Sequence, residues 1–265
     1  MTILSWNVNR RKNVVPQAEL IARFAPDVIA LQEIIGGSAP AWHRVLQEMG
    51  YRFIDSSLDL VSDEERKGPR QFGVLVAAKR PGKRLDPKIP LVWPERLLLA
   101  DIEGCGPFLT TYVPPGVTNG WVKIDTLEHL WDIARAFPKG TCTVTGDLNA
   151  PQIERPDGTV ATWGERIRKD GSTSLIASRG ERWDRAERMF FESIAELGLK
   201  DAFRARHGFD AVDHSWAWRA KGRVVPYRFD HIFVCDDREV LDFQYVHEAI
   251  DLKLSDHSPA VVRLG

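Results

Sequence analysis

Cysteine is scarce in this sequence, and the few cysteines show no ordered pattern. The 265 residues include three, Cys105, Cys142 and Cys235, an odd number at irregular spacing. Small secreted domains and zinc modules instead carry cysteines in pairs at regular intervals. Neither a disulfide framework nor a zinc cluster is therefore indicated, and we expect a reducing, cytoplasmic setting.

Long hydrophobic runs and a charge bias are also missing. No apolar stretch approaches the roughly 18 residues that a membrane span needs, and the start, Met1 to Trp6, lacks the basic region and long apolar stretch of a secretory signal. We therefore expect no membrane partner. The 36 basic and 37 acidic residues give a net charge of −1. Because a basic excess is typical of proteins that bind nucleic acid, this balance neither favours nor excludes such a partner.

What is present is the composition of an ordinary globular protein. Hydrophobic residues make up 43% of the chain and charged residues 28%, which is enough apolar material for a sizeable core. There is no internal repeat or low-complexity segment, so a disordered tail, a fibre and a coiled coil are excluded. Because no linker separates two self-sufficient halves, we expect residues 1–265 to form a single domain that acts as a monomer.

Short strand-like runs alternate with a few amphipathic helices. The runs are rich in Val, Ile, Leu, Thr and aromatic residues, which favour strands; they are Thr2–Val8, Asp27–Gln32, Phe72–Ala78, Leu97–Ile102, Phe108–Val113, Thr141–Thr145, His214–Trp218, Phe229–Cys235 and Pro259–Leu264. Apolar residues at helical spacing, with flanking proline or glycine, predict helices over Pro16–Phe24, Ala41–Met49, Trp121–Phe137 and Arg185–Leu197. So many strands with so few helices favour an α/β sandwich, in which two mostly antiparallel sheets pack face to face with helices outside.

Two stretches stand apart. Pro151–Gly180 is rich in Gly, Ser, Thr, Pro and charge, and loops of that length usually have a function or are disordered. From Arg66 to Lys88 the chain carries eight Lys or Arg residues and one acidic residue, Asp86. Either this stretch is a solvated hairpin, or it faces a phosphate backbone. Since its two basic clusters lie on either side of a strand, only an extended polyanion could contact both.

Several predicted strands end or begin at a polar residue suited to binding metal or phosphate. Alone, each such residue is most simply a turn former or a solvated side chain. Strand ends in a layered sandwich, however, converge on one rim, where all of them could share a site. In chain order they are Asn7, Asn9, Glu33, Tyr112, Asp147, Asn149, Asp230, Asp256 and His257.

The segments that carry these residues resemble the motif set of the endonuclease/exonuclease/phosphatase superfamily. They span essentially the whole chain: Trp6-Asn7-Val8-Asn9, Leu31-Gln32-Glu33, Tyr112-Val113-Pro114, Gly146-Asp147-Leu148-Asn149, Arg228-Phe229-Asp230 and Ser255-Asp256-His257. The tyrosine in the third segment resembles the motif of the exonuclease III and abasic-site endonuclease branch, whereas other branches usually have histidine at this position. One departure is Arg10-Arg11-Lys12, where that branch commonly has Gly-Leu-Arg. The resemblance implies a four-layered α-β-β-α sandwich and a nuclease that cleaves DNA with Mg²⁺ or Mn²⁺.

The resemblance also suggests roles for the residues at the strand ends. Glu33 is the first candidate for a metal-binding carboxylate, with Asn7 and Asp256 as neighbours, because Mg²⁺ prefers oxygen ligands. Asp147 would orient and deprotonate the attacking water. Catalytic contacts to the phosphate would come from Asn149, Tyr112 and a His257 ring oriented by Asp230.

Four further residues near these motifs are candidates for substrate binding. Trp216 and Tyr227 lie just before Asp230, where the resemblance places an aromatic pocket for a flipped-out or abasic nucleotide. Asn9 and Arg228 are the polar candidates for substrate binding.

Two other functions stay open. One is a phosphodiesterase or phosphatase acting on a lipid headgroup or nucleotide, which the neutral charge favours weakly and Tyr112 disfavours. The other is a binding module that kept the fold and lost catalysis, although every polar residue that hydrolysis requires is present. Zinc-protease, phosphate-loop, dinucleotide and serine-hydrolase motifs are absent from the sequence.

Overall fold

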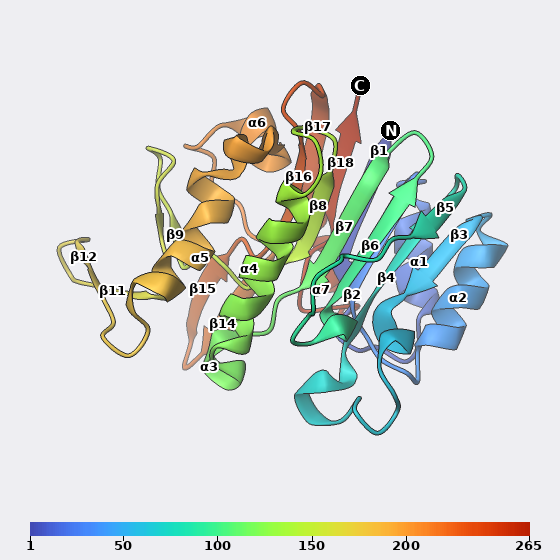
Figure 1. The fold of residues 1–265 in the computed structure, drawn as a ribbon, viewed down its shortest axis with the longest axis horizontal. Coiled ribbons are helices and arrows are strands. Elements are labelled where there is room, and N and C mark those ends of the chain that lie inside the picture. Colours follow the sequence, from blue (N-terminus) through green and yellow to red (C-terminus); the bar gives the residue numbers. More distant parts are fainter.

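Two six-stranded β-sheets lie at the centre of the computed structural model, which describes residues 1–265 (Figure 1). The first contains, in spatial order, β17 (Val240–Tyr245), β18 (Ala260–Leu264), β1 (Thr2–Asn7), β2 (Val28–Ile34), β4 (Gly73–Ala78) and β3 (Phe53–Ser56). The second contains β13 (Leu199–Asp201), β16 (Asp230–Cys235), β8 (Thr143–Asp147), β7 (Gly106–Tyr112), β6 (Leu97–Ile102) and β5 (Gly82–Arg84).

Each sheet is antiparallel except for one pair at its centre. β1 and β2 run parallel in the first sheet, and β7 and β8 run parallel in the second. Both pairs are flanked on each side by antiparallel strands. Each sheet therefore has one place where two neighbouring strands end side by side, and both places carry residues of the predicted site.

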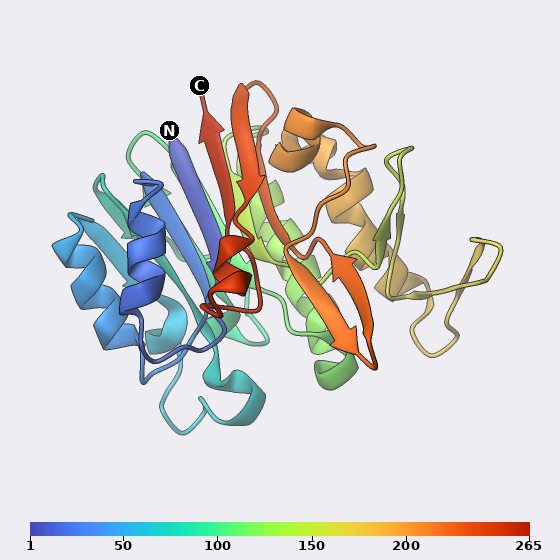
Figure 2. The ribbon, with the colours of Figure 1, turned by 180° about the vertical axis from the view of Figure 1, so that it is seen from behind.

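Helices cover the outer faces of the two sheets (Figures 1 and 2). α1 (Val15–Ala22) and α2 (Ala39–Glu48) pack on the first sheet, and α4 (Val122–Arg135) and α5 (Gly180–Glu192) pack on the second. A third apolar cluster fills the space between the sheets. The predicted four-layered sandwich is thus confirmed. The remaining helices, α3 (Gly116–Asn119), α6 (Ala202–His207) and α7 (Glu248–Asp251), are short, and none of the helices has the length and hydropathy needed to span a membrane.

All nine predicted strand runs overlap a strand, but the bounds of two helices differ from the prediction in ways that matter for packing. α5 begins at Gly180 rather than Arg185 and ends at Glu192, and a separate 3₁₀ turn follows over Ile194–Leu197. Trp121 precedes α4 and is 42% exposed, so it does not belong to the buried face of that helix. The periodicity of apolar residues continued past the end of α5 and before the start of α4, and it concealed these two boundaries.

Short hairpins occupy the segment that was irregular in sequence. β9 (Ile153–Glu154) pairs with β10 (Val160–Ala161), and β11 (Glu165–Ile167) pairs with β12 (Thr173–Leu175). A third hairpin, β14 (Trp216–Ala220) with β15 (Arg223–Tyr227), extends away from the sheets (Figure 2).

Most cations in the basic stretch from 66 to 88 have acidic partners. The pairs are Arg66 with Asp63, Arg70 with Glu95, Lys83 with Asp101, Arg84 with Asp55 and Lys88 with Asp86. Because a paired cation has less charge to offer a phosphate, the structure favours the solvated hairpin over the phosphate-facing surface for this stretch.

Candidate active site

The carboxyl ends of the two parallel strand pairs meet in the predicted site. Asn7 ends β1 opposite Gln32 of β2, and Tyr112 ends β7 opposite Asp147 of β8. Asp147 is also opposite Asp230, the first residue of β16. Residues separated by more than a hundred positions in the chain are therefore neighbours, because each ends or begins a central strand.

Local backbone irregularities position the side chains of Glu33 and Asp147. The register of β2 against β4 shifts between Gln32 and Ile34, and Glu33, in the bulge between them, has a φ of 57°. A bulge redirects a side chain that regular alternation would turn elsewhere. On β8, Gly146 has a φ of 141°, and a Cβ there would lie 2.0 Å from the carbonyl oxygen of Thr111. Glycine is thus required just before Asp147 for β7 and β8 to approach this closely.

Asn7 joins the acids of the two sheets. Its side-chain amide donates hydrogen bonds to Oε1 of Glu33 at 3.2 Å and to Oδ2 of Asp147 at 3.0 Å. Its Oδ1 accepts a hydrogen bond from the backbone of Asn9 at 3.0 Å. Asn7 is fully buried, so its orientation is fixed by these contacts.

His257 is bound to one acid and faces another. Its Nδ1 lies 2.7 Å from Oδ2 of Asp230, and its Nε2 lies 3.9 Å from Oδ2 of Asp147. Burial opposes a charge on the ring, but the two carboxylates outweigh it and raise the pKa of His257 to about 10. The imidazole is therefore a cation at neutral pH, and both of its nitrogens are donors.

Burial and neighbouring carboxylates both raise the pKa of Asp147 and of Tyr112. Burial and the nearby Asp230 raise the pKa of Asp147 to about 7, in spite of hydrogen bonds from Asn7 and from the backbone of Asn149. Burial and the carboxylates of Glu33 and Asp147 raise the pKa of Tyr112 well above its usual value. A carboxylate that titrates near neutrality is suited to accept a proton, and the tyrosine hydroxyl stays a neutral donor.

Two serines that sequence reasoning did not single out hold the catalytic segments together. The hydroxyl of Ser255 donates to the carbonyl of Asn7 at 2.7 Å and accepts from the backbone N–H of His257 at 3.1 Å. The hydroxyl of Ser215 accepts from the backbone N–H of Asp230 at 3.0 Å. Ser255 belongs to a recognised motif, but no sequence signal marked the function of Ser215.

Arg96 is a further residue without a sequence signal. Its guanidinium is buried, lies 4.4 Å from the centre of the Tyr112 ring, and leaves Nε and Nη1 without a partner. It is the last residue of a 3₁₀ turn over Pro94–Arg96 and belongs to none of the six sequence motifs. Its cation–π contact fixes the ring of Tyr112 from behind.

An aromatic cavity of about 470 Å³ adjoins the acids. Trp216 stacks on Phe229 and lies 6.2 Å from the His257 ring, and Tyr227 packs between Phe229 and Trp163. Asn149 also lines this cavity, which connects it to the catalytic strand ends. The structure thus brings Trp216 and Tyr227 together in this cavity, with Trp216 next to His257.

Lys123 forms part of the cavity wall and ties it to the outer helices. Its ammonium is buried, pairs with Glu187 of α5 at 2.7 Å and donates to the carbonyl of Asn149 at 2.8 Å. Glu187 also accepts hydrogen bonds from the backbone of Trp163 and the indole of Trp183. The wall of the cavity is therefore held by a saturated, buried ion pair.

Three predicted residues have other contacts than expected. Arg228 does not line the aromatic cavity, because its buried guanidinium pairs with Glu154 and Asp201; its placement is structural, which corrects the expected substrate contact. The amide of Asn149 is held by the carbonyl of Val113 at 2.8 Å. Asp256 is exposed, and the indole of Trp216 donates to its Oδ2 at 3.1 Å.

Comparison with known families agrees with this geometry. The model of the Endonuclease/Exonuclease/phosphatase family matches residues 4–257, from β1 to the histidine of the site. The chain belongs to this family. The resemblance inferred from the six motifs is therefore confirmed.

Individual members of the family are similar over the whole length. Exodeoxyribonuclease III from Haemophilus influenzae is 25% identical over 284 residues, covering 98% of both chains. An AP endonuclease from Archaeoglobus fulgidus superposes with a TM-score of 0.72 at 21% identity, covering 100% of this chain and 99% of that one. A 3′ phosphatase from Neisseria, bound to a product DNA hairpin, superposes with a TM-score of 0.68 at 21% identity and the same coverage.

The residues present fit the divalent cation that members of this family use. Glu33, Asp147, Asn7 and Asp256 all offer oxygen, the ligand that Mg²⁺ prefers, and such sites often use one or two carboxylates with water. The carboxylate of Glu33 is half-buried beside Asn7 and retains access to solvent. His257, which carries a proton on each nitrogen, does not fit as a metal ligand.

Proposed function

We propose that this chain is a divalent-metal-dependent phosphodiester hydrolase that cleaves DNA, of the exonuclease III and abasic-site endonuclease type. The observation that carries this proposal is the convergence of Glu33, Asp147 and the Asp230–His257 pair around Asn7. Family membership supports the reaction class, and the names of the similar proteins, with a DNA hairpin bound to one of them, support the substrate.

Glu33 is the principal ligand for Mg²⁺ or Mn²⁺, with Asn7 and Asp256 as neighbours. When bound, such an ion neutralises charge on the phosphate and makes a water molecule more acidic. The half-exposed position of Glu33 on its bulge lets the carboxylate contact an ion that a phosphate of the substrate can also reach.

Asp147 orients the attacking water and accepts its proton. Hydrogen bonds from Asn7 and from the backbone of Asn149 fix the two carboxylate oxygens. Because burial raises the pKa of Asp147 to about 7, the carboxylate is a stronger base than an exposed aspartate and is still largely ionised in mildly alkaline solution.

His257 and Tyr112 donate to the oxygens of the phosphate. Asp230 occupies Nδ1 of His257, so the charged Nε2–H is the donor that faces the reacting group. The neutral hydroxyl of Tyr112 acts from the second sheet, on a ring held by Arg96. Fixed donors aimed at developing negative charge are a large source of rate enhancement. Asn149 supports this arrangement from the cavity side.

The aromatic cavity receives an unstacked nucleotide or an abasic sugar. Trp216 and Tyr227 offer flat faces next to His257, and stacking on aromatic rings is how extruded bases are bound. Asn9, which follows Asn7, contributes to the same substrate surface.

All these groups come from one chain and from both sheets. Asn7 lies in the first strand and His257 precedes the last, so the site is complete only when residues 1–265 fold together. We accordingly propose a single catalytic domain that functions as a monomer.

A panel of labelled substrates tests the function. Duplex DNA, the same duplex with one abasic site, a duplex with a 3′-phosphate and single-stranded RNA are incubated with the protein in Mg²⁺ and in EDTA. The proposal predicts metal-dependent cleavage of one or more of the DNA substrates. Hydrolysis of a generic phosphodiester with no action on any nucleic acid would instead indicate the non-nucleic substrate.

A further inference from the structure

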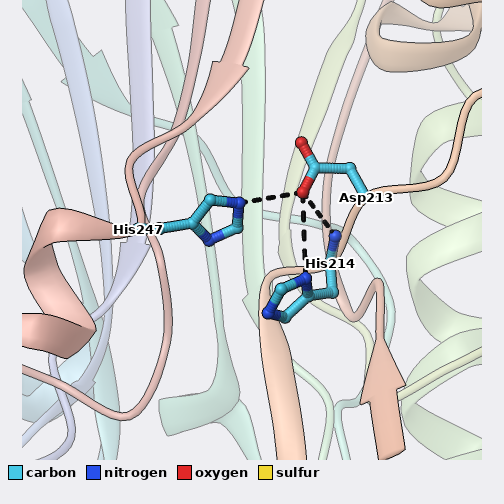
Figure 3. Close-up of side chains that lie close together, drawn as sticks. All are labelled: Asp213, His214 and His247. Carbon is cyan, nitrogen blue, oxygen red and sulfur yellow. Dashed lines mark hydrogen bonds and ion pairs between the residues drawn. The ribbon is translucent and has the colours of Figure 1, made fainter.

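A second cluster of metal-ligating side chains lies outside the active site. Asp213 and His214 precede the β14–β15 hairpin, and His247 follows β17, so the cluster joins two segments that are distant in sequence. Figure 3 shows a ring nitrogen of each histidine turned toward the carboxylate of Asp213. One donor atom from each residue lies within 4.8 Å of the others.

We propose that Asp213, His214 and His247 form a binding site for a transition-metal ion of the Zn²⁺ class, separate from the catalytic ion. Two imidazoles and a carboxylate are a common ligand set for such ions, whereas Mg²⁺ prefers oxygen alone. The proposal does not depend on the proposed nuclease activity, because it uses none of the catalytic side chains.

The distances between the donor atoms are close to those of a tetrahedral site. Oδ1 of Asp213 lies 2.9 Å from Nε2 of His247 and 3.8 Å from Nδ1 of His214. Bonds of about 2.0–2.1 Å to a tetrahedral ion separate its ligands by roughly 3.4 Å, so both distances from Asp213 are within about half an ångström of that value. The two histidine nitrogens lie within 4.8 Å of each other and would have to approach to bind one ion. The two rings stack with centroids 4.7 Å apart, and one nitrogen of each ring faces the carboxylate of Asp213 (Figure 3).

The environment of His247 supports a metal-binding orientation. Its other nitrogen, Nδ1, lies 2.9 Å from the buried hydroxyl of Ser258. Nε2 is hydrogen-bonded to Oδ1 of Asp213 at 2.9 Å, so an ion would replace the proton shared by these two atoms. Nδ1–H would then donate to Ser258, and ligating histidines usually have such a partner on the second nitrogen. The side chains of the three ligands are 31–42% exposed, so a fourth position is open to water.

An ion here would clamp the base of the β14–β15 hairpin to the corner after β17. Ser215 is next to His214, and its carbonyl oxygen accepts a hydrogen bond from the backbone N–H of Ser258 at 2.8 Å. The hydroxyl of Ser215 accepts a hydrogen bond from the backbone N–H of Asp230. The expected consequence is a more stable hairpin, with slower amide exchange from Trp216 to Tyr227.

The test titrates Zn²⁺ into the chelator-treated full chain by calorimetry in excess Mg²⁺, which occupies the oxygen-rich catalytic site. Co²⁺ replaces Zn²⁺ in a parallel titration, because its visible absorption reports nitrogen ligation. Wild type and Glu33→Gln should each bind one ion, and His214→Ala and His247→Ala should lose at least about tenfold in affinity. Ser258→Ala keeps all three ligands and should weaken binding by roughly 10- to 100-fold.

His43→Ala is the matched control, since His43 is exposed on α2 and outside the cluster. Unchanged affinity in this variant, together with Zn²⁺-dependent protection of the hairpin in wild type, supports the site. The proposal is overturned if wild type binds no Zn²⁺ under excess Mg²⁺, if the His214 and His247 variants bind as wild type does, or if only Glu33→Gln abolishes binding.

Discussion

Nδ1 of His257 lies 2.7 Å from Oδ2 of Asp230, and both side chains are buried. The pair connects the segment before β18 to the start of β16, and thereby the two sheets. Its positive charge faces Asp147, whose Oδ2 is 3.9 Å from Nε2 of the ring. A base and a cationic donor are thus held side by side before any substrate arrives.

Replacing Asp230 should change the protonation of His257. In Asp230→Asn the largest of the contributions that outweigh burial is lost, so the pKa of His257 should fall from about 10 toward about 6.5, the value of a free imidazole. The donor then disappears at neutral pH, and kcat should fall by roughly 10²–10⁴. NMR titration of the His257 ring measures the shift; a pKa that stays near 10 would show that another group holds the proton.

The aromatic cavity should affect substrate binding more than chemistry. Tyr227→Ala removes a ring that stacks on Phe229 at 4.9 Å. Stacking of a base on an aromatic side chain contributes about 1–3 kcal/mol, so KM for abasic or flipped substrates should rise roughly 5- to 150-fold. Phe209→Ala, an exposed aromatic outside the cavity, is the control. Equal KM values for both variants would exclude the cavity from substrate binding.

Exposed cations at the tip of the β14–β15 hairpin should contact the DNA backbone. Arg219, Lys221 and Arg223 are exposed and have no carboxylate within 4.0 Å. Each lost phosphate contact lowers the slope of log affinity against log salt by about 0.9, so Arg223→Ala should flatten it measurably. Lys88→Ala, whose cation pairs with Asp86 at 2.9 Å, should not. A flatter slope for Lys88→Ala and an unchanged slope for Arg223→Ala would indicate that DNA binds the basic stretch from 66 to 88 instead.

Acid should destabilise the ion-pair cluster around Arg228. Burial alone would raise the pKa of Glu154 and Asp201, but Arg228 outweighs it and lowers both. The unfolded chain takes up protons at an ordinary pKa of about 4, so the stability from these carboxylates is complete above about pH 5 and is lost as pH falls below about 4. Urea unfolding from pH 7 to 3 measures this loss.

Arg228→Met tests the same cluster. Removing one partner leaves buried acids unpaired and should cost about 3–5 kcal/mol at pH 7. The loss of stability on acidification should then be smaller, because protonation relieves the unpaired acids. Arg182→Met, which breaks a half-exposed pair with Glu128, should cost at most about 1 kcal/mol. Similar costs for the two variants would contradict the structural role of Arg228.

The sequence predicted the layers and eight of the twelve strands in the two large sheets, and it missed β3, β5, β13 and β17. Alternating apolar runs revealed nine strands, and polar residues such as Asn7 and Asp147 marked the ends of the central ones. Because strand ends converge in a layered sandwich, their proximity followed from the strand assignment alone. The family motifs then supplied the reaction class.

Other features depend on contacts that no local pattern encodes. Arg228 stands in a motif beside Asp230, yet it lies between β15 and β16 and its side chain pairs with Glu154 and Asp201, which are distant in sequence. Ser215 and Arg96 act through single tertiary contacts and have no spacing signature. The start of α5 at Gly180 was missed because the first turn of the helix is mostly polar and carries no apolar periodicity.

Single-turnover cleavage of an abasic duplex by wild type and Asp147→Asn, purified side by side, tests whether Asp147 is the base of a metal-dependent nuclease. Asp147→Asn keeps the size of the side chain and removes the base. We expect rapid cleavage by wild type in Mg²⁺ and no cleavage by wild type in EDTA. In Mg²⁺ the rate for the variant should be at least about 10²-fold lower. Cleavage by Asp147→Asn at the wild-type rate would contradict the assignment of this site as the catalytic centre.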